Sequence, residues 1–333
     1  MMTNVNPDVS LRPKVFEDFI GQKNLIDNLK IFCEAAQARK EPIDHILFYG
    51  PPGLGKTTLA LMISNRMEVN LKITSGPTLS KIADINALLT NLKPGDVLFI
   101  DEIHRMPISI EEVLYTAMED FAIDILFGEG NNAKTVRIKL PKFTLIGATT
   151  RMGLISAPLR DRFGISMRLE FYSLDDLDII VRMIAAKHGL LMQDEGIREI
   201  SLRSRQTPRI AIKIFKRVRD YVYAKKPNFQ NEVIERIFII EAFEQMKIDQ
   251  YGLSDHDRLY LNFISDNYLE KPVGIETIAS GIMEKKDTIE DMIEPYLIQI
   301  GFINRTPRGR ILTQKALEHL NLLPIIETPV DVP

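Results

Sequence analysis

One stretch, HILFYGPPGLGKTTLALMIS at residues 45–64, constrains the fold of this chain more than any other. Residues 46–49 have the apolar pattern of a short buried strand, and a helical pattern follows from Thr58. Between them, Gly50 to Thr57 match G-x-x-x-x-G-K-[ST], the pattern of a phosphate-binding loop. Strand, loop and helix in this order predict an α/β domain with a parallel sheet and flanking helices that binds a nucleotide.

Different residues of the loop are expected to contact different parts of ATP. Glycines let backbone N–H groups approach the phosphates, and the start of the helix adds a partial positive charge. Lys56 is expected to reach the β- and γ-phosphates, and the Thr57 hydroxyl to hold Mg²⁺. A glycine-rich turn before a structural helix is the alternative. The residues predicted to bind ATP here are Gly53, Leu54, Gly55, Lys56, Thr57 and Thr58.

A second buried strand ends in two carboxylates. In DVLFIDEIHR, residues 96–105, the apolar run leads directly into Asp101 and Glu102. Open α/β sheets bind their ligands at the carboxyl ends of the strands, and paired carboxylates there are costly without a cation. Asp101 suits the shell of Mg²⁺, and Glu102 suits the base that orients and deprotonates the attacking water. Capping of the following helix is the alternative.

Two further segments add polar groups to this site. FTLIGATT ends in Thr149 and Thr150, either of which could sense the γ-phosphate through water, although turn chemistry would also explain them. In RSRQTPRIA, Thr207 resembles an N-cap and Arg209 falls in the first helical turn. A cation there opposes the helix dipole at a cost of roughly 0.3–1 kcal/mol, which makes sense if Arg209 faces bound ATP.

The segment SAPLRDRFG contains Arg160 and Arg162. An arginine offered to the γ-phosphate of a neighbouring subunit would stabilise the charge of the transition state. An ion pair with Asp161 is the alternative.

The segment 121–143 is expected to form an inserted β-hairpin at about 122–140. Apolar residues alternate on both sides of a turn-rich stretch at 128–132. If the hairpin projects, one apolar face is exposed and marks a partner contact; otherwise these residues pack on the domain.

The C-terminal region predicts a winged-helix domain, with three helices followed by two short strands around Thr306–Gly309. The third helix, expected to be capped at Asp287 or Thr288, is acidic, with Asp287, Glu290, Asp291 and Glu294. The wing instead has Arg305, Arg308 and Arg310, although the net charge of the chain is −3. We therefore expect the wing arginines to contact the DNA backbone with little sequence preference. The alternative is that these arginines only make a turn soluble.

The bulk properties fit this picture. A length of 333 residues suggests two or three domains, and one cysteine, Cys33, fits a reducing compartment. No apolar run is long enough to span a membrane or to form a signal peptide, so we expect a cytoplasmic protein without a membrane partner.

Taken in order, the motifs resemble those of the RuvB family, the bacterial AAA+ ATPases that drive Holliday-junction branch migration. The resemblance runs from LRPKVFEDFIGQ through GPPGLGKTT, DVLFIDEIHR, EVLYTAMEDF, FTLIGATTRMGLISAPLRDRFGI, RLEFY, TPRIA and DTIEDMIEPYLIQIGF to RTPRGR. It implies a large ATPase domain at 1–173, a helical lid at 174–248 and a winged helix at 249–333. It also implies a homohexamer that acts with RuvA, RuvC and junction DNA.

The resemblance further implies roles for individual residues. Arg162 would be the arginine finger acting in trans, Arg209 sensor 2, and Thr149 or Thr150 sensor 1. RuvA would dock on Phe127, Val136 and Ile138. Additional ATP contacts would come from Leu11, Arg12, Ile20, Glu119, Asp120, Phe121 and Tyr172. Two places depart from the family pattern: Gln206 stands where glycine is expected, and residues 247–261 follow it loosely.

Two other functions use similar parts. A non-motor ATP switch of the initiator kind also combines an ATPase with a winged helix, but it would read specific sites, for which the acidic third helix is poorly suited. A clamp-loader ATPase would not need the basic wing.

Overall fold

The computed structural model describes residues 12–127, 134–226, 232–269 and 271–322, which fall into two units. The first unit comprises the chain up to residue 187 together with 207–209, and the second comprises 188–206 and the chain from 210 onward. Because the arrangement of the units is not determined, each is described by itself.

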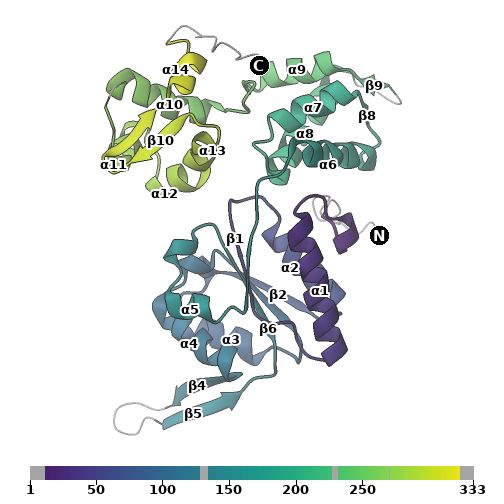
Figure 1. Cartoon of the computed structure of the whole chain (residues 1–333), viewed down its shortest axis with the longest axis vertical. Helices are drawn as coiled ribbons and strands as arrows, with labels where there is room; N and C mark the ends of the chain where they lie inside the picture. Colours follow the sequence, from purple (N-terminus) through teal and green to yellow (C-terminus); the bar gives the residue numbers. More distant parts are fainter. Residues whose placement is uncertain (1–11, 128–133, 227–231, 270, 323–333) are drawn as a thin grey trace, which may run out of the picture. The chain divides into compact units, whose positions relative to one another are not determined.

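A five-stranded parallel sheet forms the centre of the first unit (Figure 1). Its strand order is β2-β3-β6-β1-β7, with bounds Leu71–Ser75, Val97–Asp101, Thr144–Thr149, Ile46–Tyr49 and Ile165–Arg168. The three central strands are buried along almost their whole length, as in parallel sheets that are covered on both faces. The predicted strands at 46–49 and 97–100 and the α/β fold are confirmed.

Helices cover the sheet on both sides (Figure 1). They are α1 (Lys23–Arg39), α2 (Lys56–Arg66), α3 (Ile82–Thr90), α4 (Ile108–Glu119) and α5 (Ala157–Asp161), with short 3-10 turns at Phe16–Asp18, Gly76–Thr78, Ile103–Arg105 and Met152–Leu154. Helix α6 (Leu174–Lys187) follows β7 at the end of the unit. Cys33 is buried in α1. Helix α2 begins two residues before the expected start, because Gly55 at φ 106° lets the chain enter the helix directly from the loop.

The expected hairpin is present and extends from the first unit (Figure 1). It pairs β4 (Ala122–Phe127) with β5 (Lys134–Lys139) in antiparallel register. At its base the alternative holds, because Ile123 and Leu140 are buried and Ile138 packs on the core. Val136, further out, is 45% exposed. The side chain of Phe127 lies outside the described residues.

The second unit contains a helical lid and a winged helix. In this unit the lid contributes α7 (Asp194–Leu202), α8 (Pro208–Lys225), α9 (Arg236–Gln245) and a short parallel pair, β8 (Leu191–Met192) with β9 (Val233–Ile234). The first three residues of α8 include Pro208 and Arg209, which group with the first unit.

The winged helix has its own core of apolar side chains. It contains α10 (Asp255–Tyr268), α11 (Ile275–Gly281), α12 (Lys286–Thr288), a π-helical turn (Ile289–Ile293), α13 (Glu294–Gln299), the wing strands β10 (Ile303–Thr306) and β11 (Gly309–Leu312), and α14 (Gln314–His319). The expected third helix is therefore present, over residues 286–299, with one π-helical turn inside it. Pro295 cannot donate a backbone hydrogen bond, and the ladder widens into a π turn just before it.

No helix among the described residues is long and apolar enough to cross a membrane.

Candidate functional site

The phosphate-binding loop leaves β1 and enters α2 with Lys56 folded back over it. Lys56 is only 8% exposed, and its Nζ donates to the carbonyl oxygens of Gly50 at 2.8 Å and Pro51 at 2.7 Å. Burial lowers the pKa of Lys56 to about 8, with Asp101 acting in the opposite direction and Arg209 in the same one. The loop thus holds a desolvated ammonium where the phosphates are predicted to bind.

The low pKa of Lys56 predicts pH-dependent ATP binding. A lysine with a pKa near 8 is about 90% protonated at pH 7 and about 10% at pH 9, and only the charged form attracts phosphate. Because raising the pH removes this charge, the Kd for ATP should rise about tenfold between pH 7 and pH 9, measured by calorimetry with a non-hydrolysable analogue. Lys56→Arg keeps its charge and should bind more weakly but with little pH dependence. An unchanged Kd in the unsubstituted chain would contradict this reading.

The carboxyl ends of β1, β3 and β6 meet at one edge of the sheet, because these strands are parallel neighbours. Asp101 ends β3, and its Oδ1 accepts the N–H of Glu102 at 2.9 Å. Because β1 leads into the loop at the same edge, Asp101 lies at the end of the sheet where the loop begins. With the Thr57 hydroxyl it offers oxygen ligands, which suit Mg²⁺ completed by phosphate oxygens.

Glu102 adopts an unusual backbone conformation, with φ 48°. A non-glycine residue in this region is strained, and such strain often occurs at functional positions. Gly76 permits it, since a Cβ there would lie 2.3 Å from the Glu102 carbonyl oxygen. Arg105 holds the Glu102 carboxylate through Nη1 at 3.1 Å. The carboxylate is thus aimed from the end of β3 by both backbone and side-chain contacts.

The structure distinguishes the two candidate threonines. Thr149 ends β6 and is almost fully buried, with its Oγ1 3.0 Å from Nδ1 of His104 and accepting the N–H of Arg151 at 2.9 Å. Its carbonyl accepts the N–H of Gly50 at 3.2 Å, which ties β6 to the phosphate-binding loop. Thr150 lies just past the strand and is half-buried.

Phe19, which precedes α1, and Tyr172, which follows β7, both contact the phosphate-binding loop. The Tyr172 hydroxyl donates to the Leu54 carbonyl at 3.3 Å, and the Tyr172 ring packs on Gly21, next to Ile20. Phe19 packs on Gly55. Arg12 is exposed, and Leu11 lies outside the described residues.

Arg209 reaches the loop through its backbone. Its N–H lies 3.4 Å from the Gly53 carbonyl, and a Cβ on Gly53 would be 3.0 Å from the Arg209 Cβ. Gly53 has φ 83° and so tolerates this close approach. The Arg209 residue itself is exposed.

Arg162 belongs to a different cluster, on α4 and α5. Its Nη2 pairs with Glu119 at 3.1 Å, its Nη1 donates to the Pro158 carbonyl at 2.7 Å, and its guanidinium lies 4.5 Å from the centre of the Tyr115 ring. Asp120 pairs with Arg137. Both Glu119 and Asp120 were predicted to bind ATP. Glu119 instead forms an ion pair with the predicted arginine finger, and Asp120 follows it in the chain.

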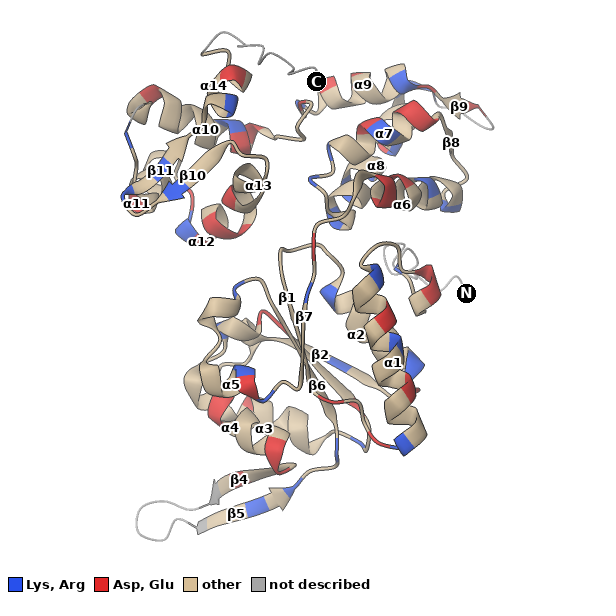
Figure 2. Cartoon of the chain, viewed as in Figure 1, with Lys and Arg blue, Asp and Glu red and all other residues tan. Residues whose placement is uncertain are grey.

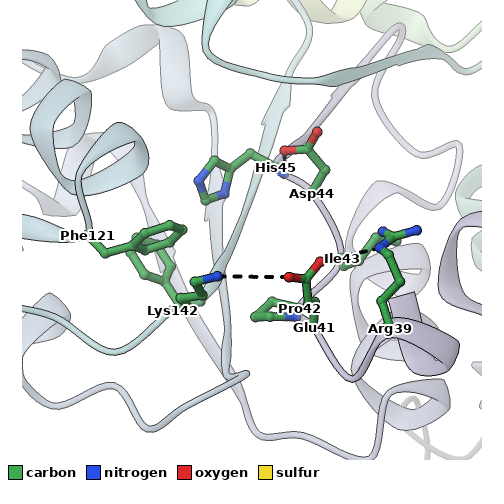
Figure 3. Close-up of a pocket in the computed structure, with 9 residues that line it drawn as sticks. Arg39, Glu41, Pro42, Ile43, Asp44, His45, Phe121 and Lys142 are labelled. Carbon is green, nitrogen blue, oxygen red and sulfur yellow. Dashed lines mark hydrogen bonds and ion pairs between the residues drawn. The ribbon is translucent and has the colours of Figure 1, made fainter. Parts of the chain in front are cut away.

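Phe121 packs on an aromatic cluster beside a pocket of about 260 Å³ (Figure 3). Its ring lies edge-on to Phe143 at 5.9 Å. Within the pocket wall, His45 accepts the Leu145 N–H on Nδ1 at 2.9 Å and so donates from Nε2 to the Met118 carbonyl at 3.2 Å. Burial lowers the pKa of His45, which keeps it neutral in this structural role.

The wing arginines and the acidic third helix face each other in the winged helix, where Figure 2 shows the two charges side by side. Glu294 is fully buried and accepts Nε of Arg305 at 2.7 Å and Nε of Arg310 at 2.8 Å. The Tyr260 hydroxyl donates to the same carboxylate at 2.9 Å, and Arg310 also reaches Glu290 at 3.2 Å. The charges of these two arginines are therefore largely compensated inside the domain.

Arg308 differs from the other two arginines. It lies at the exposed turn between β10 and β11, and within the described residues its side chain makes no ion pair. Sequence reasoning treated the three arginines as equivalent because it could not pair the wing with the helix.

Sequence reasoning also missed three contributors to these sites: Phe19, His104 and the buried Tyr260. An aromatic residue before a glycine, a histidine after paired carboxylates and a tyrosine on a helix are too common to have signalled them.

Each of the three parts of the chain matches the model of a known protein domain. Residues 11–169 match the Holliday junction DNA helicase RuvB P-loop domain, residues 172–249 the RuvB AAA lid domain, and residues 250–321 the RuvB C-terminal winged helix domain. The chain belongs to the RuvB family. The first match makes the loop around Lys56 the nucleotide site of a P-loop domain.

Individual RuvB proteins are similar over almost the whole chain. The Holliday junction branch migration complex subunits RuvB of Ehrlichia chaffeensis and Neorickettsia sennetsu are 53% and 51% identical over 94% and 95% of this chain and 94% of their own length. The solved Thermotoga maritima RuvB Holliday junction branch migration motor matches with a TM-score of 0.85 and 44% identity, over 94% of this chain and 99% of its own. The predicted RuvB-type organisation, with AAA+ domain, lid and winged helix, is confirmed.

Proposed function

We propose that this chain is an ATP-driven DNA motor that moves Holliday junctions, acting as a homohexamer with RuvA and RuvC. The observation that carries the proposal is one chain with a buried P-loop lysine, a carboxylate pair at the neighbouring strand end and a winged helix, in the order of the RuvB domains. A nucleotide site and a DNA module on one chain suit conversion of hydrolysis into movement along DNA.

In this proposal ATP binds between the loop and the segment around Ile20 and Tyr172. Lys56 holds the phosphates, Thr57 and Asp101 provide oxygen ligands for Mg²⁺, and Glu102 takes the proton of the attacking water. Thr149 is the better candidate for sensor 1, because its buried hydroxyl is already oriented by His104 at the strand end. Bound Mg²⁺ would neutralise phosphate charge.

The subunit that provides the nucleotide loop need not provide the arginine finger. In this chain Arg209 contacts the loop, whereas Arg162 is bound with Glu119 on α4 and α5. Two arginines held in separate clusters fit a ring in which Arg162, Glu119 and Asp120 face the ATP of the next subunit. The exposed Val136 on the hairpin is the described residue best placed to dock RuvA.

The wing supplies the grip on DNA, and Arg308 is expected to carry its uncompensated charge. Arg308→Ala should weaken binding equally for unrelated duplexes and lower the salt slope by about one unit per engaged wing, without changing thermal stability. Arg310→Ala is the contrasting variant, because it deprives the buried Glu294 of a partner and should destabilise the domain by about 3 kcal/mol.

Competition between unrelated duplexes of equal length tests the function itself, with binding followed by fluorescence anisotropy. A motor that grips backbone should bind them equally. Strong preference for one duplex would instead favour an initiator-type ATP switch.

A further inference from the structure

The two residues before the Thr207-Pro208-Arg209 segment are held in a strained conformation. Arg205 and Gln206 both have positive φ, 49° and 53°. Non-glycine residues rarely adopt this region and persist there only where the surroundings impose it. Glycine would adopt this backbone without strain, but both positions carry long side chains. Contacts elsewhere must therefore hold the turn.

Those contacts come from the winged helix. Arg205 donates from Nε to the Gly252 carbonyl at 2.9 Å and forms a two-pronged ion pair with Asp257 on α10, with one bond, from Nη1 to Oδ1, at 3.1 Å. Both side chains are nearly buried, 14% and 3% exposed, and the Arg205 guanidinium lies 5.2 Å from the Tyr296 ring centre. Pairs of this bidentate geometry fix orientation as well as distance.

The neighbouring contacts tighten the same junction. The Gln206 side chain accepts a hydrogen bond from Nε2 of Gln299 on α13. Gly252 is pressed onto the loop so closely that a Cβ there would lie 2.2 Å from the Arg203 carbonyl oxygen. The strained turn is therefore attached to α10 and α13, and α13 begins with Glu294, which holds the wing arginines.

The next three residues are attached to the nucleotide site instead. Residues 207–209 group with the first unit, whereas Gln206 and Ile210 group with the second. Thr207 is buried, and the Arg209 N–H faces the Gly53 carbonyl of the phosphate-binding loop. Within five residues, the chain thus contacts the winged helix through Arg205 and Gln206 and then the phosphate-binding loop through Arg209.

We propose that Arg205 and Gln206 are positioning residues that couple the nucleotide at the P-loop to the winged helix. When phosphates bind and Arg209 shifts, a turn with little conformational freedom passes the displacement to Asp257 and Gln299. Coupling of this kind is reciprocal, so DNA on the wing changes ATP affinity by the same factor. The inference rests on the proposed function for its ligands.

The test measures coupling rather than activity. In a Glu102→Gln background, intended to prevent turnover, the affinity for a four-way junction is measured with and without ATP and Mg²⁺. The ratio of these two affinities is the coupling factor, and allosteric coupling factors are typically about 5- to 150-fold. Arg205→Ala should bring the factor below about twofold while changing the ATP-free affinity for DNA by less than about twofold. Arg203→Ala is the matched control, since Arg203 is equally buried but pairs with Glu199 inside the lid, and it should keep the factor of the parent.

An Arg205→Ala variant that keeps the coupling factor of the parent would overturn the inference. If thermal unfolding shows that Arg205→Ala does not fold, Gln299→Ala, which removes one amide, should lower the factor instead, and an unchanged factor there would overturn it. A parent that binds DNA with no response to ATP would overturn this inference alone, whereas a parent that does not bind DNA would overturn the proposed function as well.

Discussion

Glu102→Gln is expected to bind ATP with nearly unchanged affinity and to hydrolyse it about 10²–10⁴ times more slowly. The amide keeps the shape of the carboxylate at the strained end of β3 but cannot accept the proton of the attacking water. Retained binding is expected because Lys56, the predicted phosphate ligand, is held by the carbonyl oxygens of Gly50 and Pro51 and not by this side chain. Single-turnover hydrolysis and equilibrium ATP binding on the same preparation measure the two effects separately.

A matched variant distinguishes the role of Glu102 from a general effect of lost charge. Glu112→Gln removes an exposed carboxylate on α4 and should leave hydrolysis within about twofold of the parent. Normal turnover by Glu102→Gln would rule out its assignment as the base.

Arg162→Ala is expected to lower hydrolysis by about 10³–10⁵-fold, the range over which an arginine finger acts. ATP binding should persist, because in this chain Arg162 is held by Glu119 and Pro158 and the P-loop is contacted by Arg209. Arg160→Ala is the control, since Arg160 lies two residues away and pairs only with Asp161 at 3.8 Å. Its rate of ATP hydrolysis should be close to that of the parent.

Mixed rings test whether the finger acts between subunits. An Arg162→Ala subunit has an intact P-loop, and a Lys56→Ala subunit has an intact finger. Mixing two inactive preparations should therefore restore part of the hydrolysis. If every mixing ratio stays inactive although the subunits co-assemble, the finger acts within its own chain.

The strands, loop and helix that position the candidate nucleotide site could be predicted from sequence because their signals are local. The strand, the loop and the helix around Lys56 are contiguous, and the carboxylates of Asp101 and Glu102 follow a single apolar run. Parallel pairing then brings these strand ends together without further information. The family resemblance rested on the same contiguous motifs.

The wing could not be predicted in the same way. Its arginines and the acidic helix were read as separate features, one attracting DNA and the other repelling it. In the structure Glu294 is buried between Arg305 and Arg310, so that part of this charge is internal. Pairing across 11 and 16 residues depends on how the hairpin folds back, which charge patterns along the chain do not encode.

Similar limits apply to the loop before Arg209. The sequence marks Gln206 as a departure from the family pattern, but the contact that accompanies it lies at Gln299, 93 residues away. Long-range contacts of this kind set the strain at Arg205 and Gln206, and no periodicity or capping rule predicts them.

The most direct measurement is migration of a synthetic four-way junction with labelled arms, carried out with and without RuvA from the same organism. The proposed motor predicts ATP-dependent conversion of the junction to duplex products in the presence of RuvA, with none when Lys56→Ala replaces the parent. A chain that binds the junction with RuvA and hydrolyses ATP but leaves the branch point where it was would contradict the account.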